Sequence, residues 1–139
     1  MNTPNIPDAA VLPWMTVSPG FELKVLHGQE DEDTRALLLR LQPGTIVDRH
    51  RHTGEVHAIT LSGQRKLLDT GEVIGPGGYV YEPPGNEDRW MAIGPEPLLI
   101  FVTVRGVIEE LDDAGTVTVR MTTGGIAGSY QRFLEERPR

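Results

Sequence analysis

The sequence predicts one all-β domain built from antiparallel strands. Short segments rich in Val, Ile, Leu and aromatic residues alternate with turn signals along the 139 residues. Gly and Pro, present 16 and 11 times, separate these segments, which is typical of a sandwich or a barrel. No repeat or linker divides the chain, and its length suits a single hydrophobic core. We therefore expect a single domain over residues 1–139.

The elements follow one another in a regular order. An N-terminal arm, residues 1–20, precedes the first strand, and Ser62-Gly63 forms the turn between two of the later ones. Only the tail, residues 129–139, has helical spacing, with Ser129 as its N-cap. The expected strands are 21–27, 35–42, 56–63, 64–71, 79–82, 98–111 and 116–121.

Composition and charge exclude several classes of partner. A net charge of −7 and a pI near 5.0 disfavour a nucleic-acid partner, because a phosphate backbone is repelled. No apolar run has the roughly 18 residues that a membrane span needs. The N-terminus lacks the pattern of a secretory signal, so we expect a cytoplasmic protein with no membrane partner. The absence of Cys excludes disulfides and thiolate chemistry.

The acidic segment GQEDEDT, residues 28–34, lacks the spaced oxygen ligands of a calcium loop. We therefore expect it to form a solvated turn.

Three of the four histidines lie in the segment GTIVDRHRHTGEVH, residues 44–57. His50 and His52 are two positions apart, so both point to one face of a strand. Two imidazoles on one face make half of a Zn, Fe, Mn or Ni site. His57 faces the other side unless the strand register shifts by one residue, in which case it completes the site. His27 ends a strand and is expected on the surface.

Two glycine-rich patterns around these histidines resemble the cupin superfamily. Gly44 is followed after five residues by His50-x-His52 and later by Gly63, as in the first cupin motif. Gly77 is followed after five residues by Pro83-x-Gly85, as in the second. The stretch LLLRLQPGTIVDRHRHTGEVHAITLSG, with YVYEPPG behind it, is similar to the ChrR-like cupins related to 2,4'-dihydroxyacetophenone dioxygenase and acetylacetone dioxygenase. The resemblance implies a single-domain cupin, a conical antiparallel β-barrel or jelly roll, with a short C-terminal helix.

The resemblance also implies a ligand set. His50 and His52 match the first two metal ligands of the family, and Val56 stands where many cupins have a glutamate. The third family histidine comes three residues after the Pro-x-Gly glycine, where this chain has Asp88. Asp88 either completes a set of two histidines and one carboxylate, or is a turn residue of a site that has lost its metal.

Residues near the second motif are candidates for contact with a ligand. Trp90 is expected to shape the substrate pocket, although aromatic residues there, including Tyr79 and Tyr81, also fit the core or rim of a barrel. Glu82 either accepts a hydrogen bond from a histidine N–H or is a charge at a strand end. No further catalytic residue is assigned.

The resemblance implies an oxidoreductase: a non-haem dioxygenase that cleaves a C–C bond of a small hydroxyketone or diketone. Fe(II) is the expected divalent metal, with Zn, Ni or Mn as alternatives. Two other functions stay open, a non-catalytic cupin that senses a metal or small molecule, and a non-redox isomerase or decarboxylase. The apolar arm from Ala9 to Trp14 and the strand edges need covering, so we expect a homodimer or a larger assembly.

Overall fold

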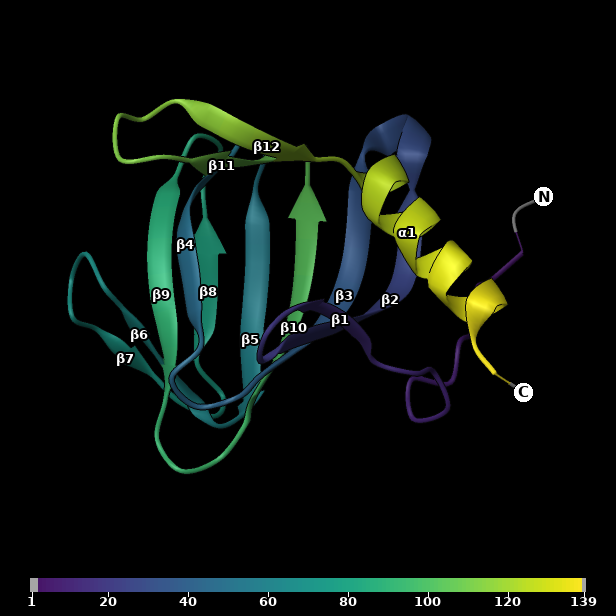
Figure 1. Ribbon diagram of the computed structural model, residues 1–139, viewed down its shortest axis with the longest axis horizontal. Helices are drawn as coiled ribbons and strands as arrows, with labels where there is room; N and C mark the ends of the chain where they lie inside the picture. Colours follow the sequence, from purple (N-terminus) through teal and green to yellow (C-terminus); the bar gives the residue numbers. More distant parts are fainter. Residues whose placement is uncertain (1–2, 139) are drawn as a thin grey trace.

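The computed structural model describes residues 3–138, which form two facing antiparallel sheets of six strands each (Figure 1). The strands of one sheet, in order of pairing, are β1 (Met15–Ser18), β2 (Phe21–Gln29), β3 (Thr34–Leu41), β10 (Leu98–Arg105), β5 (Val56–Ser62) and β8 (Tyr79–Glu82). Those of the other are β12 (Val117–Met121), β11 (Ile108–Leu111), β4 (Ile46–His52), β9 (Glu87–Ile93), β6 (Gln64–Leu67) and β7 (Val73–Ile74). The prediction of an all-β single domain is confirmed.

The hydrophobic core lies between the two sheets because alternate residues of each strand point inward. Strand β10 alternates between buried and half-buried residues along almost its whole length. Strands β5 and β9 do the same, so a shift of either by one residue would turn its apolar side chains outward. The core residues are Leu37, Leu41, Val56, Ala58, Trp90, Ala92, Leu98, Ile100, Val102 and Val104.

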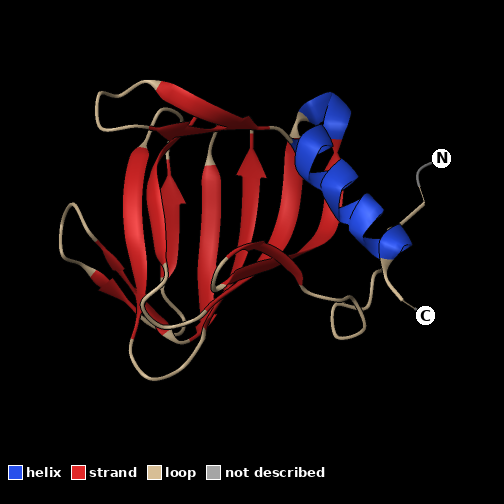
Figure 2. Cartoon of the chain, in the orientation of Figure 1, coloured by secondary structure: helices blue, strands red, loops and turns tan. Residues whose placement is uncertain are grey.

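The C-terminal helix, α1 (Thr123–Glu136), is the long helix drawn in blue in Figure 2. It begins six residues earlier than expected. Thr122, and not Ser129, is its N-cap, and the Thr122 side chain accepts a hydrogen bond from the Gly125 amide at 3.0 Å. The glycines at 124, 125 and 128 disfavour a helix and hid its first turns in the sequence. Tertiary packing against β2 holds these turns in place. No helix within residues 3–138 is long and apolar enough to cross a membrane.

Two expectations about the strands are also corrected. The segment 98–111 forms two strands in different sheets, because Gly106 with φ of +87° breaks it between β10 and β11. The segment 87–93, for which we expected no strand, forms β9. Burial alternates along the whole strand, but the sequence did not show it, because the inward position 88 is an acid and the four residues from Trp90 are all apolar.

The N-terminal arm is partly a strand, and the acidic segment is a turn. Part of the expected arm, residues 15–18, is strand β1, while residues 1–2 lie outside the described residues. Trp14 packs between Lys24 Nζ and the Arg40 guanidinium, at 4.5 and 4.3 Å from its ring centre. The acidic segment forms a short, exposed 3-10 turn, η1 (Glu30–Glu32), as expected.

Gly63, at the turn between β5 and β6, should tolerate no side chain. Its φ is +75°, and a Cβ there would lie 2.5 Å from the Pro97 carbonyl oxygen. Gly71 has a similar φ of +80°, but a Cβ there would meet nothing within 4 Å. We expect Gly71→Ala to cost about 1 kcal/mol of unfolding free energy, and Gly63→Ala about 1–3 kcal/mol more. Urea denaturation measures both, and equal costs would show that the close approach is not rigid.

Candidate metal centre

His50 and His52 lie on the inward face of β4, as their spacing predicts. Both are buried, and their rings meet edge to face with centroids 4.8 Å apart. Strand β4 pairs with β9 on one side and β11 on the other, so the two rings sit in the middle of the second sheet. They project into the space between the sheets, where they line a cavity.

Hydrogen bonding leaves both imidazoles able to bind a metal. His50 Nδ1 lies 2.8 Å from the backbone oxygen of Asp48, and a carbonyl can only accept. Nδ1 therefore carries the proton and Nε2 of His50 keeps its lone pair. His52 Nδ1 is buried and has no hydrogen-bond partner among the described residues. The other nitrogen, Nε2, faces a carboxylate, so it is the nitrogen through which His52 would bind a metal.

Two buried carboxylates lie beside the histidines. Asp88 stands opposite His50 in the β4–β9 register, and its Oδ1 accepts a hydrogen bond from the Arg89 amide at 2.8 Å. Glu82 ends β8, and its Oε2 lies 3.8 Å from His52 Nε2. The other Glu82 oxygen accepts a hydrogen bond from the Asn86 side chain at 2.7 Å.

The two carboxylates differ in how they relate to the cavity. Glu82 belongs to its wall, whereas Asp88 does not. Within residues 3–138, no three His, Asp or Glu side chains converge closely enough to form a preformed metal cage. The pair His50 and His52 therefore fits the imidazole half of a metal centre, and a third protein ligand requires one carboxylate to move.

Burial shifts the ionisation of these groups toward their neutral forms. The pKa of His52 falls to about 3, first because of burial and then because of its neighbours His50 and Arg35. Burial also raises the pKa of Glu82 and of Asp88, while Arg65 and His50 partly oppose that rise. His52 is thus neutral at physiological pH, which is the form that binds a metal.

Arg65 is the neighbour of this centre that the sequence analysis missed. It is buried on β6, and its guanidinium carbon lies 4.8 Å from the centre of the Trp90 ring. Its positive charge acts on both Asp88 and Glu82. The alternation of side chains along a β-strand was the one sign of this in the sequence, because it places Arg65 on the inward face of its strand.

The cavity between the sheets has a volume of about 410 Å³. Its walls are mostly apolar, and Trp90 forms part of them, which is the position expected for a residue that shapes a pocket. Its polar lining includes His50, His52, Glu82 and two buried arginines, Arg35 and Arg65.

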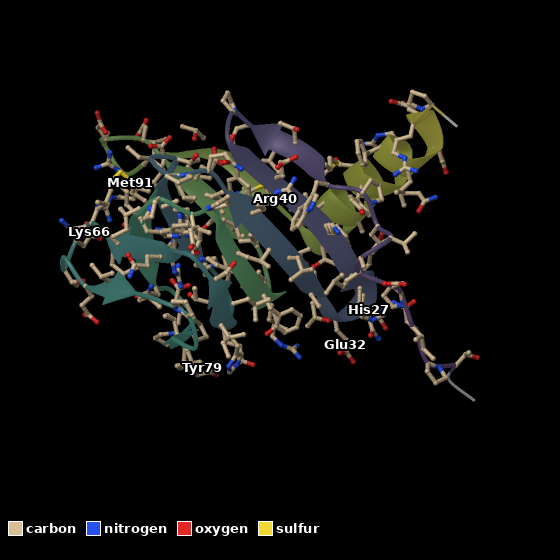
Figure 3. All side chains as sticks on the ribbon, turned by 90° about the horizontal axis from the view of Figure 1, so that it is seen from below. His27, Glu32, Arg40, Lys66, Tyr79 and Met91 are labelled. Carbon is tan, nitrogen blue, oxygen red and sulfur yellow. The ribbon has the colours of Figure 1, made fainter. Side chains whose placement is uncertain are left out.

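The other candidates lie outside the cavity. The His57 side chain is 41% exposed, and its Nδ1 is hydrogen-bonded to the Tyr79 hydroxyl on the outer face of the sheet. The register shift that would turn His57 inward is therefore wrong. Tyr79 and Tyr81 are also exposed and do not wall the cavity, and Tyr79 projects from the periphery of the molecule (Figure 3). His27 is exposed on β2, as expected.

Comparison with known families decides the family of the chain. Residues 3–107 match the family model of the ChrR cupin-like domain. The chain belongs to this cupin family. No sequence among the curated proteins matches it.

Solved structures share the fold of this cupin at low sequence identity. An RmlC-like cupin from Ralstonia eutropha is 23% identical, with a TM-score of 0.86 over 95% of this chain and 89% of that one. An acetylacetone dioxygenase from Acinetobacter johnsonii is 14% identical, with a TM-score of 0.86 over 95% and 94%. ChrR from Rhodobacter sphaeroides, in complex with SigE, is 20% identical, with a TM-score of 0.59 over 70% and 50%.

The low pKa of His52 predicts how stability depends on pH. Between about pH 6.5 and pH 3 the unfolded chain binds a proton that folded His52 does not bind. Metal-free protein should therefore lose stability as the pH falls from 6.5 toward 4, with a contribution from this group of up to about 1.4 kcal/mol per pH unit. The raised pKa values of Glu82 and Asp88 act in the opposite direction, because their burial cost is relieved when they are protonated.

The contribution of His52 is isolated by urea denaturation of His52→Gln at several pH values. This variant should have a flatter loss of stability in acid than the wild type. His27→Gln, which removes an exposed imidazole, controls for the loss of a histidine as such. Equal slopes for wild type and His52→Gln would show that His52 is charged in the folded protein.

Proposed function

We propose that this cupin is a metal-dependent enzyme that acts on a small ketone. The observation that carries the proposal is the pair His50 and His52, buried side by side in the wall of an apolar cavity. Neutral imidazoles are the commonest protein ligands of divalent metals, and enclosed apolar pockets are typical of sites for small organic molecules.

The third ligand of the proposed centre is a carboxylate. Glu82 is favoured by geometry, because its free oxygen already faces His52 Nε2 at 3.8 Å. Asp88 is favoured by its place opposite His50 and by its position relative to the second cupin motif. Two histidines and one carboxylate leave open positions on non-haem Fe(II), the metal that we propose, and Zn, Ni or Mn would bind the same donors.

The proposed reaction is oxidative cleavage of a C–C bond in a hydroxyketone or diketone. The likeness in fold to an acetylacetone dioxygenase supports this reaction class. A bound divalent metal would act as a Lewis acid toward the ketone oxygens. The residues of this chain would exclude water through the apolar walls, orient the substrate against Trp90, and hold positive charge near the reacting oxygens through Arg65.

One observation favours a second candidate, a cupin that binds a metal or small molecule without turnover. Residues 3–138 hold no preformed set of three ligands, and position 88 has aspartate in place of the family histidine. The match to the ChrR cupin-like family is consistent with such a role. A non-redox isomerase or decarboxylase would use the same two histidines.

Substitutions at the centre should separate ligands from neighbours. We expect His50→Ala and His52→Ala each to abolish metal-dependent stabilisation, because binding to the folded state alone raises the melting temperature. Glu82→Gln and Asp88→Ala should identify the third ligand, since only the variant that removes it weakens metal binding. Asp88→His should restore the three-histidine set and strengthen binding.

The measurement is metal content together with the melting temperature, with and without added metal. Asp69→Asn, which removes an exposed acid that pairs with Arg49, is the matched control. Unchanged metal content in both histidine variants would refute the proposed centre. Unchanged content in Asp88→Ala and Glu82→Gln together would leave the histidines as the only protein ligands.

Dioxygen uptake separates the candidate functions. Protein reconstituted with Fe(II) should consume dioxygen when acetylacetone or a hydroxyketone is added, and His52→Ala should not. Metal binding without uptake, over a panel of ketones, would favour the sensor or the non-redox enzyme.

We also propose that the protein is a homodimer or a larger assembly. The end strands β8 and β7 are short and carry exposed apolar side chains, namely Tyr79 and Tyr81 on β8 and Val73 on β7. A second chain could cover these edges. Light scattering at micromolar concentration should give at least twice the chain mass of 15.3 kDa, and a mass of one chain would contradict the proposal.

A further inference from the structure

Arg35 brings a positive charge to the wall of the cavity. It lies on β3 in phase with Leu37 and Leu41, so its side chain points between the sheets, and the residue is only 3% exposed. Its Nη1 donates to the Gly106 carbonyl and to Thr123 Oγ1, both at 2.9 Å. Its Nη2 is buried and has no hydrogen-bond partner among the described residues.

The protein offers this charge little compensation. Within residues 3–138, the only acidic oxygen within 4.0 Å of the guanidinium is Asp33 Oδ1, at 3.9 Å. That oxygen already accepts the Thr123 amide at 3.0 Å, and the Asp33 side chain is 36% exposed. A buried guanidinium with one distant partner is destabilising unless another anion approaches it.

Arg65, the second buried arginine of the cavity, is in a different position. The charges of Asp88 and Glu82 oppose the effect of its burial, whereas for Arg35 Asp33 is the only described residue that does so. Arg35 also lies close enough to His52 for its charge to act on that imidazole. The cavity therefore has a poorly compensated cation near the proposed metal centre.

We propose that the ligand of this cavity carries a carboxylate that binds Arg35, while its ketone group faces His50 and His52. A guanidinium binds a carboxylate through charge-assisted N–H bonds, and within residues 3–138 the two N–H groups of Nη2 have no acceptor. The substrate class then narrows to ketones that also bear a carboxylate, short enough for about 410 Å³. The placement of the ketone group rests on the proposed function, whereas the placement of the carboxylate rests on Arg35 alone.

The test compares two ligands of almost equal shape by isothermal titration calorimetry. Levulinate carries a carboxylate, and acetonylacetone is the neutral diketone in which a methyl group replaces the charged oxygen. The protein as purified should bind levulinate at least about tenfold more tightly than acetonylacetone, because hydrogen bonds to a charged group contribute that much. Arg35→Gln should reduce the preference to less than about twofold, and Arg35→Lys, which keeps the charge, should retain part of it.

Arg40→Gln is the matched control. Arg40 lies on the same strand but points outward, where it pairs with Glu22 at 2.8 Å, so this variant should keep the full preference for levulinate. Equal binding of the two ligands by the wild type would overturn the inference even if Arg35→Gln did not fold. A preference that survives in folded Arg35→Gln, or that disappears when a chelator removes metal, would also overturn it, because the carboxylate would then bind elsewhere.

The same experiment distinguishes this inference from the proposed function. If no metal binds but the preference for levulinate depends on Arg35, the metal-dependent function fails and the carboxylate site stands. If metal binds through His50 and His52 but the preference is absent, the carboxylate site fails and the metal centre stands.

Discussion

The register of β4 between β9 and β11 is the constraint on which the site depends. It turns His50 and His52 inward together and sets Asp88 opposite His50. A shift of one residue would expose both imidazoles and bury Arg51 in their place. The apolar residues that alternate along β5, β9 and β10 hold this register, because the same shift would turn the core outward. Packing and site geometry therefore follow from a single alignment of strands.

Burial favours metal binding by one group that this register brings together and disfavours it for others. It keeps His52 uncharged, which favours metal binding, and it disfavours ionisation of Glu82 and Asp88. Arg65 and Arg35 are buried too, but an arginine stays charged and must find an anion. Arg65 has two carboxylates nearby, and among the described residues Arg35 has only Asp33, at 3.9 Å. A divalent cation beside the carboxylates and an organic anion beside Arg35 would together balance the charge of the cavity.

Much of this arrangement could be predicted from the sequence because it follows from local rules. The spacing of His50 and His52 determined their common face, and the glycine patterns indicated the fold. Strand β9 and the start of α1 could not be predicted, because Asn86 to Asp88 look like a turn and the glycines at 124 and 125 disfavour a helix. In both places tertiary packing overrides local preference. Strand periodicity places Arg35 and Arg65 on inward faces. Neither was expected to be buried, because charged side chains are usually exposed.

The central claim is that His50 and His52 bind one divalent metal ion. The most direct measurement is an anomalous difference map from crystals grown with Mn(II) or Zn(II). We predict one internal peak about 2.0–2.2 Å from an imidazole nitrogen of each histidine, with an oxygen of Glu82 or Asp88 as a further ligand. A map without a peak between these two rings, from protein that binds the metal in solution, would contradict it.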